Sequence, residues 1–118
     1  MGQADSAPGN IQQLTHDQYQ VLHDQISSAR EVCTDPAKRT LLRQRAEQVQ
    51  AVLTALDQAD MQSRTSDFED LEKQVASVNS DLAALKGEID KIVQDVAVAT
   101  QVAGAIDSAV SAAAKLFG

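Results

Sequence analysis

Two histidines and one cysteine are the side chains in this 118-residue chain best suited to metal binding or nucleophilic chemistry. His16 and His23 would lie near one face of a helix but about 10 Å apart along its axis, too far apart to share one metal ion. Cys33 has no second cysteine for a disulfide or a metal site, and no histidine is placed to activate its thiol. We therefore expect exposed or half-buried histidines, a buried cysteine and no metal site.

Four cations fall within eight residues: Lys38, Arg39, Arg43 and Arg45. Such a cluster could bind phosphate or an acidic partner. No aromatic residues are interleaved with it, however, and the formal net charge of the chain is −7, which disfavours the many phosphate contacts of a nucleic-acid interface. We therefore interpret the cluster as a solvated helix face that balances nearby acids, and we expect no nucleic-acid partner.

Carboxylates are numerous, but their spacing matches no known catalytic or calcium-binding pattern. Asp57 and Asp60 form one pair, and residues 67–72 carry four further acids whose placement suits the first turn of a helix. The sequence contains no glycine-rich phosphate loop, nucleophile elbow or zinc-binding helix. Aromatic residues make up only 3% of the chain, so few side chains are available to line a ligand pocket. We expect a protein that is not an enzyme, with no catalytic residues, cofactor or small-molecule substrate.

The elements that would position these side chains are helices, because apolar residues recur every three and four positions. The alternation is unbroken from Phe68 to Phe117 and is typical of the a and d positions of a coiled coil. Its members are Phe68, Leu71, Val75, Val78, Leu82, Leu85, Ile89, Ile92, Val96, Ala99, Ala103, Ile106, Val110, Ala113 and Phe117. Earlier in the chain the same spacing joins Tyr19, Leu22, Ile26, Ala29 and Cys33, and then Leu42, Ala46, Val49, Leu53 and Leu56. The pattern predicts an all-α, up-down helical bundle of three to four helices with coiled-coil-like heptad packing.

Capping residues predict where the helices begin. Thr15 followed by Gln18 forms a capping box, and Ser66 followed by Glu69 forms another. Asp35 before Pro36 is the clearest boundary, since an aspartate N-cap with proline at the first helical position is a typical helix start. We predict a disordered tail over 1–13 and a single helical domain over 14–118, with helices over about 15–32, 36–61, 67–95 and 96–116.

The boundary between the last two predicted helices is left open. Gly87 and Asp95 are the two candidate positions for a turn, but the apolar spacing passes through both without a break. A single helix over 67–115 would be roughly 70 Å long, and the helix predicted over 36–61 would cover only about half of it.

Beyond residue 95 a second apolar stripe joins the first: Val98, Val102, Ala105, Ala109, Ala112 and Leu116. A helix with two apolar stripes needs two neighbours, because soluble monomers seldom expose large apolar patches. The segment would therefore fold back as a fourth helix, pair with another chain or enter a membrane. The association surface that we predict consists of Val96, Val98, Ala99, Val102, Ala103, Ile106, Val110, Leu116 and Phe117.

These patterns favour a non-enzymatic interaction or structural protein that acts through helix–helix packing, with a protein partner that is either a second copy or another helical chain. The alternative is a membrane-active, pore-forming-like protein that releases its C-terminal amphipathic segment. Asp107 and the shortage of aromatic anchors and cations disfavour this alternative. In general appearance the chain resembles small bacterial helical proteins, a resemblance that assigns no residue a role. The location stays open between the bacterial cytoplasm and export.

Overall fold

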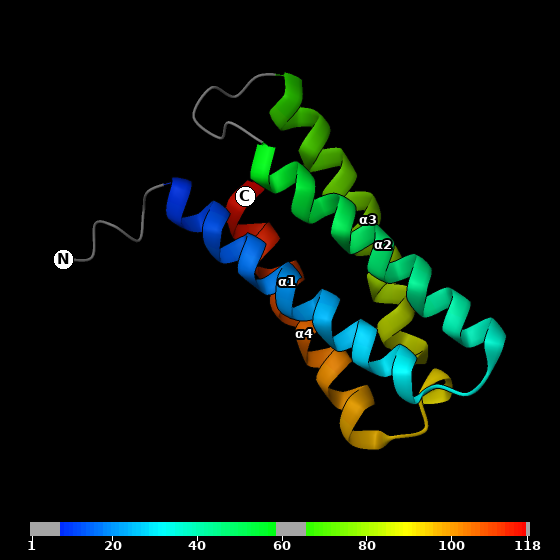
Figure 1. Ribbon diagram of the computed structural model, residues 1–118. Coiled ribbons are helices and arrows are strands. Elements are labelled where there is room, and N and C mark those ends of the chain that lie inside the picture. The colour runs from blue at the N-terminus through cyan, green and yellow to red at the C-terminus, as the bar shows by residue number, and fades with distance from the viewer. Residues whose placement is uncertain (1–7, 59–65, 118) are drawn as a thin grey trace.

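The computed structural model describes residues 8–58 and 66–117. Within these ranges the chain forms four helices: α1 (Pro8–Val32), α2 (Pro36–Gln58), α3 (Ser66–Ile92) and α4 (Val96–Phe117). Consecutive helices run in opposite directions, and the described residues contain no strand (Figure 1). The prediction of an all-α up-down bundle is confirmed.

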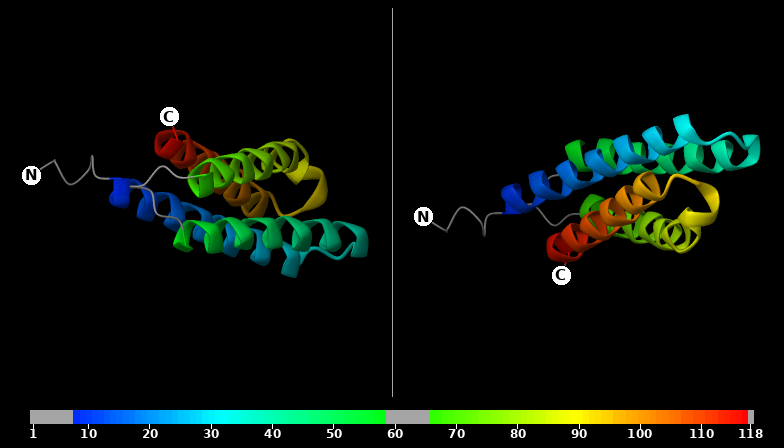
Figure 2. Two further views of the ribbon diagram at one scale, coloured as in Figure 1. Left: turned by 90° about the horizontal axis from the view of Figure 1, so that it is seen from above. Right: turned by 90° about the horizontal axis from the view of Figure 1, so that it is seen from below.

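The four helices form two hairpins that pack as two layers (Figure 2). One layer holds α1 and α2, and the other holds α3 and α4. Helix α1 packs against α2 and α4, and α3 packs against the same two helices, so α1 and α3 lie diagonally across the bundle. The shortest dimension of the molecule is 19 Å, which corresponds to two helix diameters of about 10 Å each.

The connection between α1 and α2 forms as its sequence predicts. The Asp35 Oδ1 atom accepts hydrogen bonds from the backbone N–H groups of Ala37 at 2.9 Å and Lys38 at 3.2 Å. These bonds satisfy two of the donors that a helix leaves free at its start, and Pro36 has no N–H to satisfy. Cys33, at the other end of the connection, is buried.

The connection between α3 and α4 shows that a single continuous helix was the wrong alternative. Helix α3 ends at Ile92 rather than at residue 95, and α4 begins at Val96 after a three-residue turn. The Asp95 Oδ1 atom accepts a hydrogen bond from Val98 N at 3.2 Å, so Asp95 caps α4 as Asp35 caps α2. Gly87, the other candidate turn, lies inside α3.

The start of α1 also differs from the prediction. The helix begins at Pro8 rather than at Thr15, so residues 8–13 of the predicted tail are helical, whereas 1–7 lie outside the described residues. Thr15 is fully buried inside the helix, where its Oγ1 donates a 2.7 Å hydrogen bond to the carbonyl of Ile11. The capping box proposed for Thr15 is therefore wrong, because its hydroxyl bonds back to the preceding turn of a helix that is already under way.

The predicted boundary between the second and third helices falls mostly outside the described residues. Helix α2 is described to Gln58, and residues 59–65, which include the predicted end at residue 61, are not described. Helix α3 begins at Ser66, close to the predicted residue 67, but the Ser66 side chain that would form the capping box is not described. Helix α4 ends at Phe117, next to the predicted residue 116.

All four helices contribute to one apolar core. The stripes predicted for the first two helices are buried throughout, from Tyr19 to Cys33 and from Leu42 to Leu56. The hydroxyl of Tyr19 donates a hydrogen bond to Asn79 Oδ1, which joins α1 to α3 across the diagonal of the bundle. The core is therefore shared between the two hairpins and does not divide into two smaller ones.

Candidate interaction surface

Helix α4 folds back into the bundle and receives the two neighbours that its two apolar stripes require. On the stripe from Val98 to Leu116, the carbonyl of Ala112 lies 3.4 Å from the Thr15 hydroxyl of α1. The other stripe, from Val96 to Phe117, follows α3, and its residues line cavities together with residues of that helix. Of the three arrangements that the sequence allows, the structure shows the first.

The nine residues predicted as an association surface do not all remain available. Four of them are buried in the core: Ala99, Val102, Ile106 and Leu116. Four others are half-buried at its edge: Val98, Ala103, Val110 and Phe117. Val96 is 77% exposed, the highest value among the exposed large apolar residues. An association surface on α4 would therefore contain fewer residues than the sequence predicts, because residues of both stripes are buried in the core.

The apolar residues that remain accessible lie along one line between α3 and α4. Val96, Ala103, Val110 and Phe117 follow one another at seven-residue intervals, so they lie about two turns apart on the same side of α4. Together with Gly87 of α3 they form what we call the α3–α4 seam. Val96 is exposed, and the other three α4 residues are half-buried at the edge of the core.

The helices along this seam are not fully packed against each other. A cavity of about 350 Å³ lies near the connection, between Gly87 and Ile89 of α3 and Val96 and Ala103 of α4. A second cavity, of about 200 Å³, lies near the other end, where Val110 and Phe117 are among the α4 residues that line it. The two hollows give the seam room to accept side chains from another helix.

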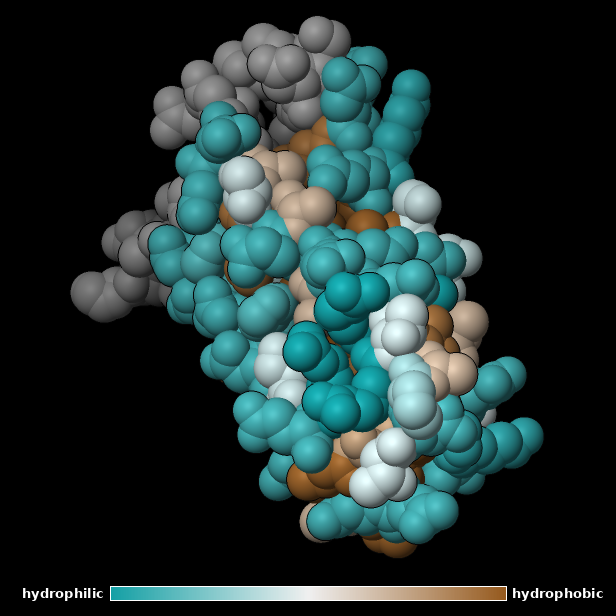
Figure 3. Space-filling model, turned by 45° about the vertical axis from the view of Figure 1, so that its right-hand side comes forward, coloured by the Kyte–Doolittle hydropathy of each residue, from teal (hydrophilic) through white to brown (hydrophobic). Residues whose placement is uncertain are grey.

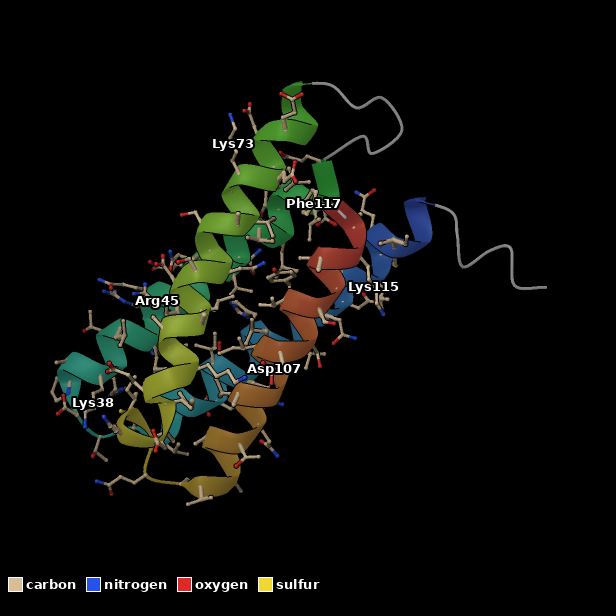
Figure 4. The ribbon with its side chains drawn as sticks, turned by 180° about the vertical axis from the view of Figure 1, so that it is seen from behind. Lys38, Arg45, Lys73, Asp107, Lys115 and Phe117 are labelled. Carbon is tan, nitrogen blue, oxygen red and sulfur yellow. The ribbon has the colours of Figure 1, made fainter. Side chains whose placement is uncertain are left out.

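One ion pair joins α3 and α4 between these two cavities. Lys86 Nζ lies 2.6 Å from Asp107 Oδ1, and both side chains are largely exposed. Figure 4 shows Asp107 in the middle of α4, well separated from Phe117 near the end of the same helix. An exposed pair of this kind adds little stability, so its main effect is to fix how α3 and α4 lie against each other.

The two histidines and the cysteine each have a different partner in the fold. His16 is half-buried, with Nε2 3.3 Å from Asp57 Oδ1 of α2, and His23 lies 3.7 Å from its neighbour Asp24. The Sγ of Cys33 is buried and donates to the carbonyl of Ile92 at 3.6 Å. Within the described ranges, no group of three or more His, Cys, Asp and Glu side chains could hold a metal ion.

Burial changes the protonation equilibrium of Tyr19. Burial in the core raises the pKa of Tyr19 from its ordinary 10.0 to about 12, because the phenolate would lose its hydration. The tyrosine lies among core side chains, so this shift describes the cost of placing a phenolate in the core and does not indicate an active site.

The four-cation cluster, which the sequence presents as one face, is divided by the fold. Lys38 Nζ donates to the carbonyl of Lys91 at 3.0 Å, near the end of α3. Arg45 donates to Gln48, which in turn donates to Asp81 of α3, each at 2.7 Å. Lys38 thus connects α2 to α3 directly, whereas Arg45 does so only through Gln48, and Figure 4 shows the separate positions of Lys38 and Arg45 along α2.

Arg39 and Arg43, the other two members, line a different part of the surface. Together with Arg30 of α1 they surround a cavity of about 270 Å³ between the end of α1 and the start of α2. Figure 3 shows that the most hydrophilic side chains on the face it draws gather in one region. Arg30 precedes Lys38 by eight residues and belongs to α1, and the hairpin turn at residues 33–35 brings it beside Arg39 and Arg43.

Helix α4 is also long and apolar enough to cross a membrane, judged by its length and composition alone. Core helices of soluble proteins often meet the same criterion, and α4 contributes many residues to the core. The composition therefore does not decide between these two environments.

Comparisons with known proteins do not assign a function to this arrangement. No protein-family model matches the chain, and no curated protein and no solved structure matches it. Two surface features are taken further below: the α3–α4 seam, with its two cavities, and the cavity lined by three arginines.

Proposed function

We propose that this protein is a non-enzymatic helical interaction protein that acts through helix–helix packing, and that it self-associates through the α3–α4 seam. A helical partner of different sequence would use the same surface. The observation that supports the proposal is a row of apolar residues along one side of α4, in which Val96 is exposed and Ala103, Val110 and Phe117 are half-buried.

The dimensions of the seam suit another helix. From Val96 to Phe117 the row runs roughly 30 Å, the length of a helix of about 20 residues. Its residues repeat every seven positions, as the contact positions of a coiled coil do. The small side chains at Gly87 and Ala103 allow a neighbouring backbone to approach closely. Two such seams related by a two-fold axis would each cover the other's exposed row.

Val96 provides the most direct test, because it is exposed and its replacement should not disturb the fold. Glutamate is favourable in the first turn of a helix, so Val96→Glu should preserve α4 while placing a charge in the seam. Val21→Glu is the matched control, since Val21 is also an exposed apolar residue, 48% accessible, but lies on α1 away from the seam. Both variants change the net charge equally.

The measurement is molar mass by light scattering after gel filtration, over a range of protein concentrations. We expect the wild-type chain and Val21→Glu to reach the mass of a dimer or larger at high concentration, and Val96→Glu to remain a monomer. A wild-type chain that stays monomeric at every concentration would rule out self-association. Association that persists in Val96→Glu would place the contact elsewhere.

A second candidate function is membrane activity through α4, favoured by the length and apolar composition of that helix. Insertion would require α4 to leave the bundle, which would uncover the core side of α1 and carry Asp107 and Lys115 into the membrane. A leakage assay with dye-loaded liposomes over a range of pH tests this candidate. Absence of leakage at every pH would eliminate it and would leave the seam proposal unaffected.

A further inference from the structure

The cavity between the end of α1 and the start of α2 has an unusual lining. Its residues are Arg30, Pro36, Arg39, Thr40 and Arg43, and none of them is acidic. Three cations therefore converge on one hollow of about 270 Å³ in a chain whose acidic residues outnumber its basic ones by 17 to 10. The chain has more than enough acidic residues to pair with these cations, yet no carboxylate of the described residues lines the cavity.

The three guanidinium groups have no structural role that accounts for their convergence. Among the described residues, none of Arg30, Arg39 and Arg43 forms an ion pair or a side-chain hydrogen bond. Of the other two members of the cluster, Lys38 donates to the carbonyl of Lys91 in α3, and Arg45 donates to Gln48 within α2. Lys38 and Arg45 therefore have hydrogen-bond partners for their side chains within the fold, whereas the three arginines of the cavity have none in the described ranges.

Their arrangement also carries a cost for stability. Arg39 and Arg43 lie one helical turn apart on α2, and like charges at this spacing repel each other by a few tenths of a kcal/mol. Arg30 adds a third positive charge from the neighbouring helix. A bound anion would convert this repulsion into attraction, because it would contact all three groups at once.

The donors available in the cavity belong to the side chains. The first N–H groups of α2, at Ala37 and Lys38, already donate to Asp35. The Thr40 hydroxyl donates to the carbonyl of Pro36 at 3.0 Å, so it too is occupied. The guanidinium groups remain, and their planar, paired N–H donors match the oxygen atoms of phosphate groups.

We infer that this cavity is a binding site for a diphosphate group, held by Arg30, Arg39 and Arg43. The volume accommodates more than a single phosphate, and three guanidinium groups balance the charge of two phosphates better than that of one. No aromatic side chain lines the cavity, so the site recognises the phosphates and not an attached base. The site is independent of the α3–α4 seam, and the two proposals can fail separately.

The test is titration of the full chain with sodium pyrophosphate at low ionic strength, followed by calorimetry and by the amide NMR signals around Thr40. Orthophosphate, ADP and adenosine serve as comparison ligands. The variant is Arg39→Gln/Arg43→Gln, in which both side chains are exposed, so the fold should be retained. The matched control is Lys73→Gln/Lys115→Gln, which removes the same charge from the opposite end of the molecule (Figure 4).

We expect pyrophosphate and ADP to bind with similar affinity, orthophosphate to bind more weakly and adenosine not to bind. The double arginine variant should lose about tenfold or more in affinity, and the lysine control should change it less than about twofold. Arg30→Gln alone should weaken binding as well, since the site draws on both helices. Binding should also weaken as salt is added.

Several results would overturn the inference. Failure to bind pyrophosphate at low ionic strength would do so, and so would an equal loss in the arginine variant and the lysine control. If ADP bound more tightly than pyrophosphate, and adenosine competed with ADP for the site, the base would be the group that is recognised. Tighter binding of hexaglutamate than of pyrophosphate would identify the cavity as a docking patch for an acidic protein segment.

Discussion

The two hairpins of this bundle are built to one plan but are packed unequally. In each, a buried residue, an exposed residue and a capping aspartate form the connection: Cys33 to Asp35 in the first hairpin and Val93 to Asp95 in the second. The buried positions of α2 recur in α4 sixty residues later. Leu42, Ala46, Val49, Val52, Leu53 and Leu56 correspond in this way to Val102, Ile106, Ala109, Ala112, Ala113 and Leu116.

What differs between the hairpins is the size of the side chains at these equivalent positions. Val49, Val52 and Leu53 of α2 are replaced by alanines in α4. Small side chains let α4 lie closely and extensively along α1. Toward α3, where two cavities remain along the seam, α4 also presents small side chains, at Ala99, Ala103 and Ala113. The same pattern of buried positions can therefore give a close contact, as between α4 and α1, or an interface with cavities, as between α4 and α3. The volume of the side chains decides which of the two forms.

The largest expected effect compares equivalent leucines of the two hairpins. Leu22 of α1 and Leu82 of α3 are both fully buried, and each change to alanine should lower the free energy of unfolding by about 2–5 kcal/mol. We expect Leu22→Ala to cost more, because α1 is closely packed on both sides, whereas α3 borders cavities into which its surroundings can relax. Urea denaturation followed by circular dichroism measures both values. A larger loss of unfolding free energy in Leu82→Ala than in Leu22→Ala would contradict the view that α1 is packed more closely than α3.

The next effect concerns the bond that joins the hairpins, Tyr19 to Asn79. Because the folded pKa of Tyr19 is about 12 and the ordinary value is 10.0, the folded state resists ionisation. The contribution of the neutral Tyr19 to the free energy of unfolding is fully present below about pH 10, and it is lost as the pH rises toward 12, by up to about 3 kcal/mol.

Tyr19→Phe should remove this pH dependence and cost about 1 kcal/mol at neutral pH through the lost hydrogen bond. Denaturation of both proteins at several pH values isolates the contribution of Tyr19. Since the chain has one tyrosine and no tryptophan, its ultraviolet absorbance reports the ionisation directly. Ionisation near pH 10 in the folded protein would show that the tyrosine is not enclosed between the hairpins.

A smaller effect compares the two capping aspartates. Asp35 accepts two backbone hydrogen bonds and Asp95 accepts one. We expect Asp35→Ala to lower the free energy of unfolding by about 1–2 kcal/mol and Asp95→Ala by about 0.5–1 kcal/mol. Thermal unfolding of the two variants gives the order. Asn at either position is the control, since it retains a capping oxygen and should restore most of the loss.

The smallest effect uses the two glycines inside the helices of the second hairpin. A methyl group added at Gly87 or Gly104 would meet no other atom within 4 Å. Each change to alanine should therefore stabilise the protein by roughly 0.5–1 kcal/mol, through lower backbone entropy in the unfolded chain. If the seam is an association surface, Gly87→Ala should also weaken association measured by light scattering, whereas Gly104→Ala should not. Equal effects on association would argue against a role for Gly87 in the seam.

The sequence predicted most of the fold because apolar spacing determines which helix face is buried, and the same residues form the core. It left the second turn open because Ile92 and Val96 keep the apolar spacing across the break. Val96 fits the pattern of a buried residue but is exposed, since the chain reverses just before it. Asp95 was the signal that could have located the turn, because it caps α4 as Asp35 caps α2. Pro36 made the first boundary clear, and the second has no proline.

The surface features were harder to predict for a different reason. The sequence placed Lys38, Arg39, Arg43 and Arg45 in one group, but neighbouring helices decide which of them are used in packing. The contribution of Arg30 depends on the hairpin that brings α1 beside α2. At Thr15 the local pattern itself was misleading. It resembles a helix cap, but Thr15 lies inside a longer helix and its hydroxyl bonds to the preceding turn.

The alternating direction of the four helices has a practical consequence for attaching the protein to other objects. The first turn of α1 and the last turn of α4 lie at one end of the bundle, and the two short connections lie at the other (Figure 1). A tether joined to either terminus would therefore hold the molecule by the same end. On a sensor surface or as a fusion, it would present the arginine-lined cavity and the hollow near Val96 outward, so binding at either could be measured without detaching it.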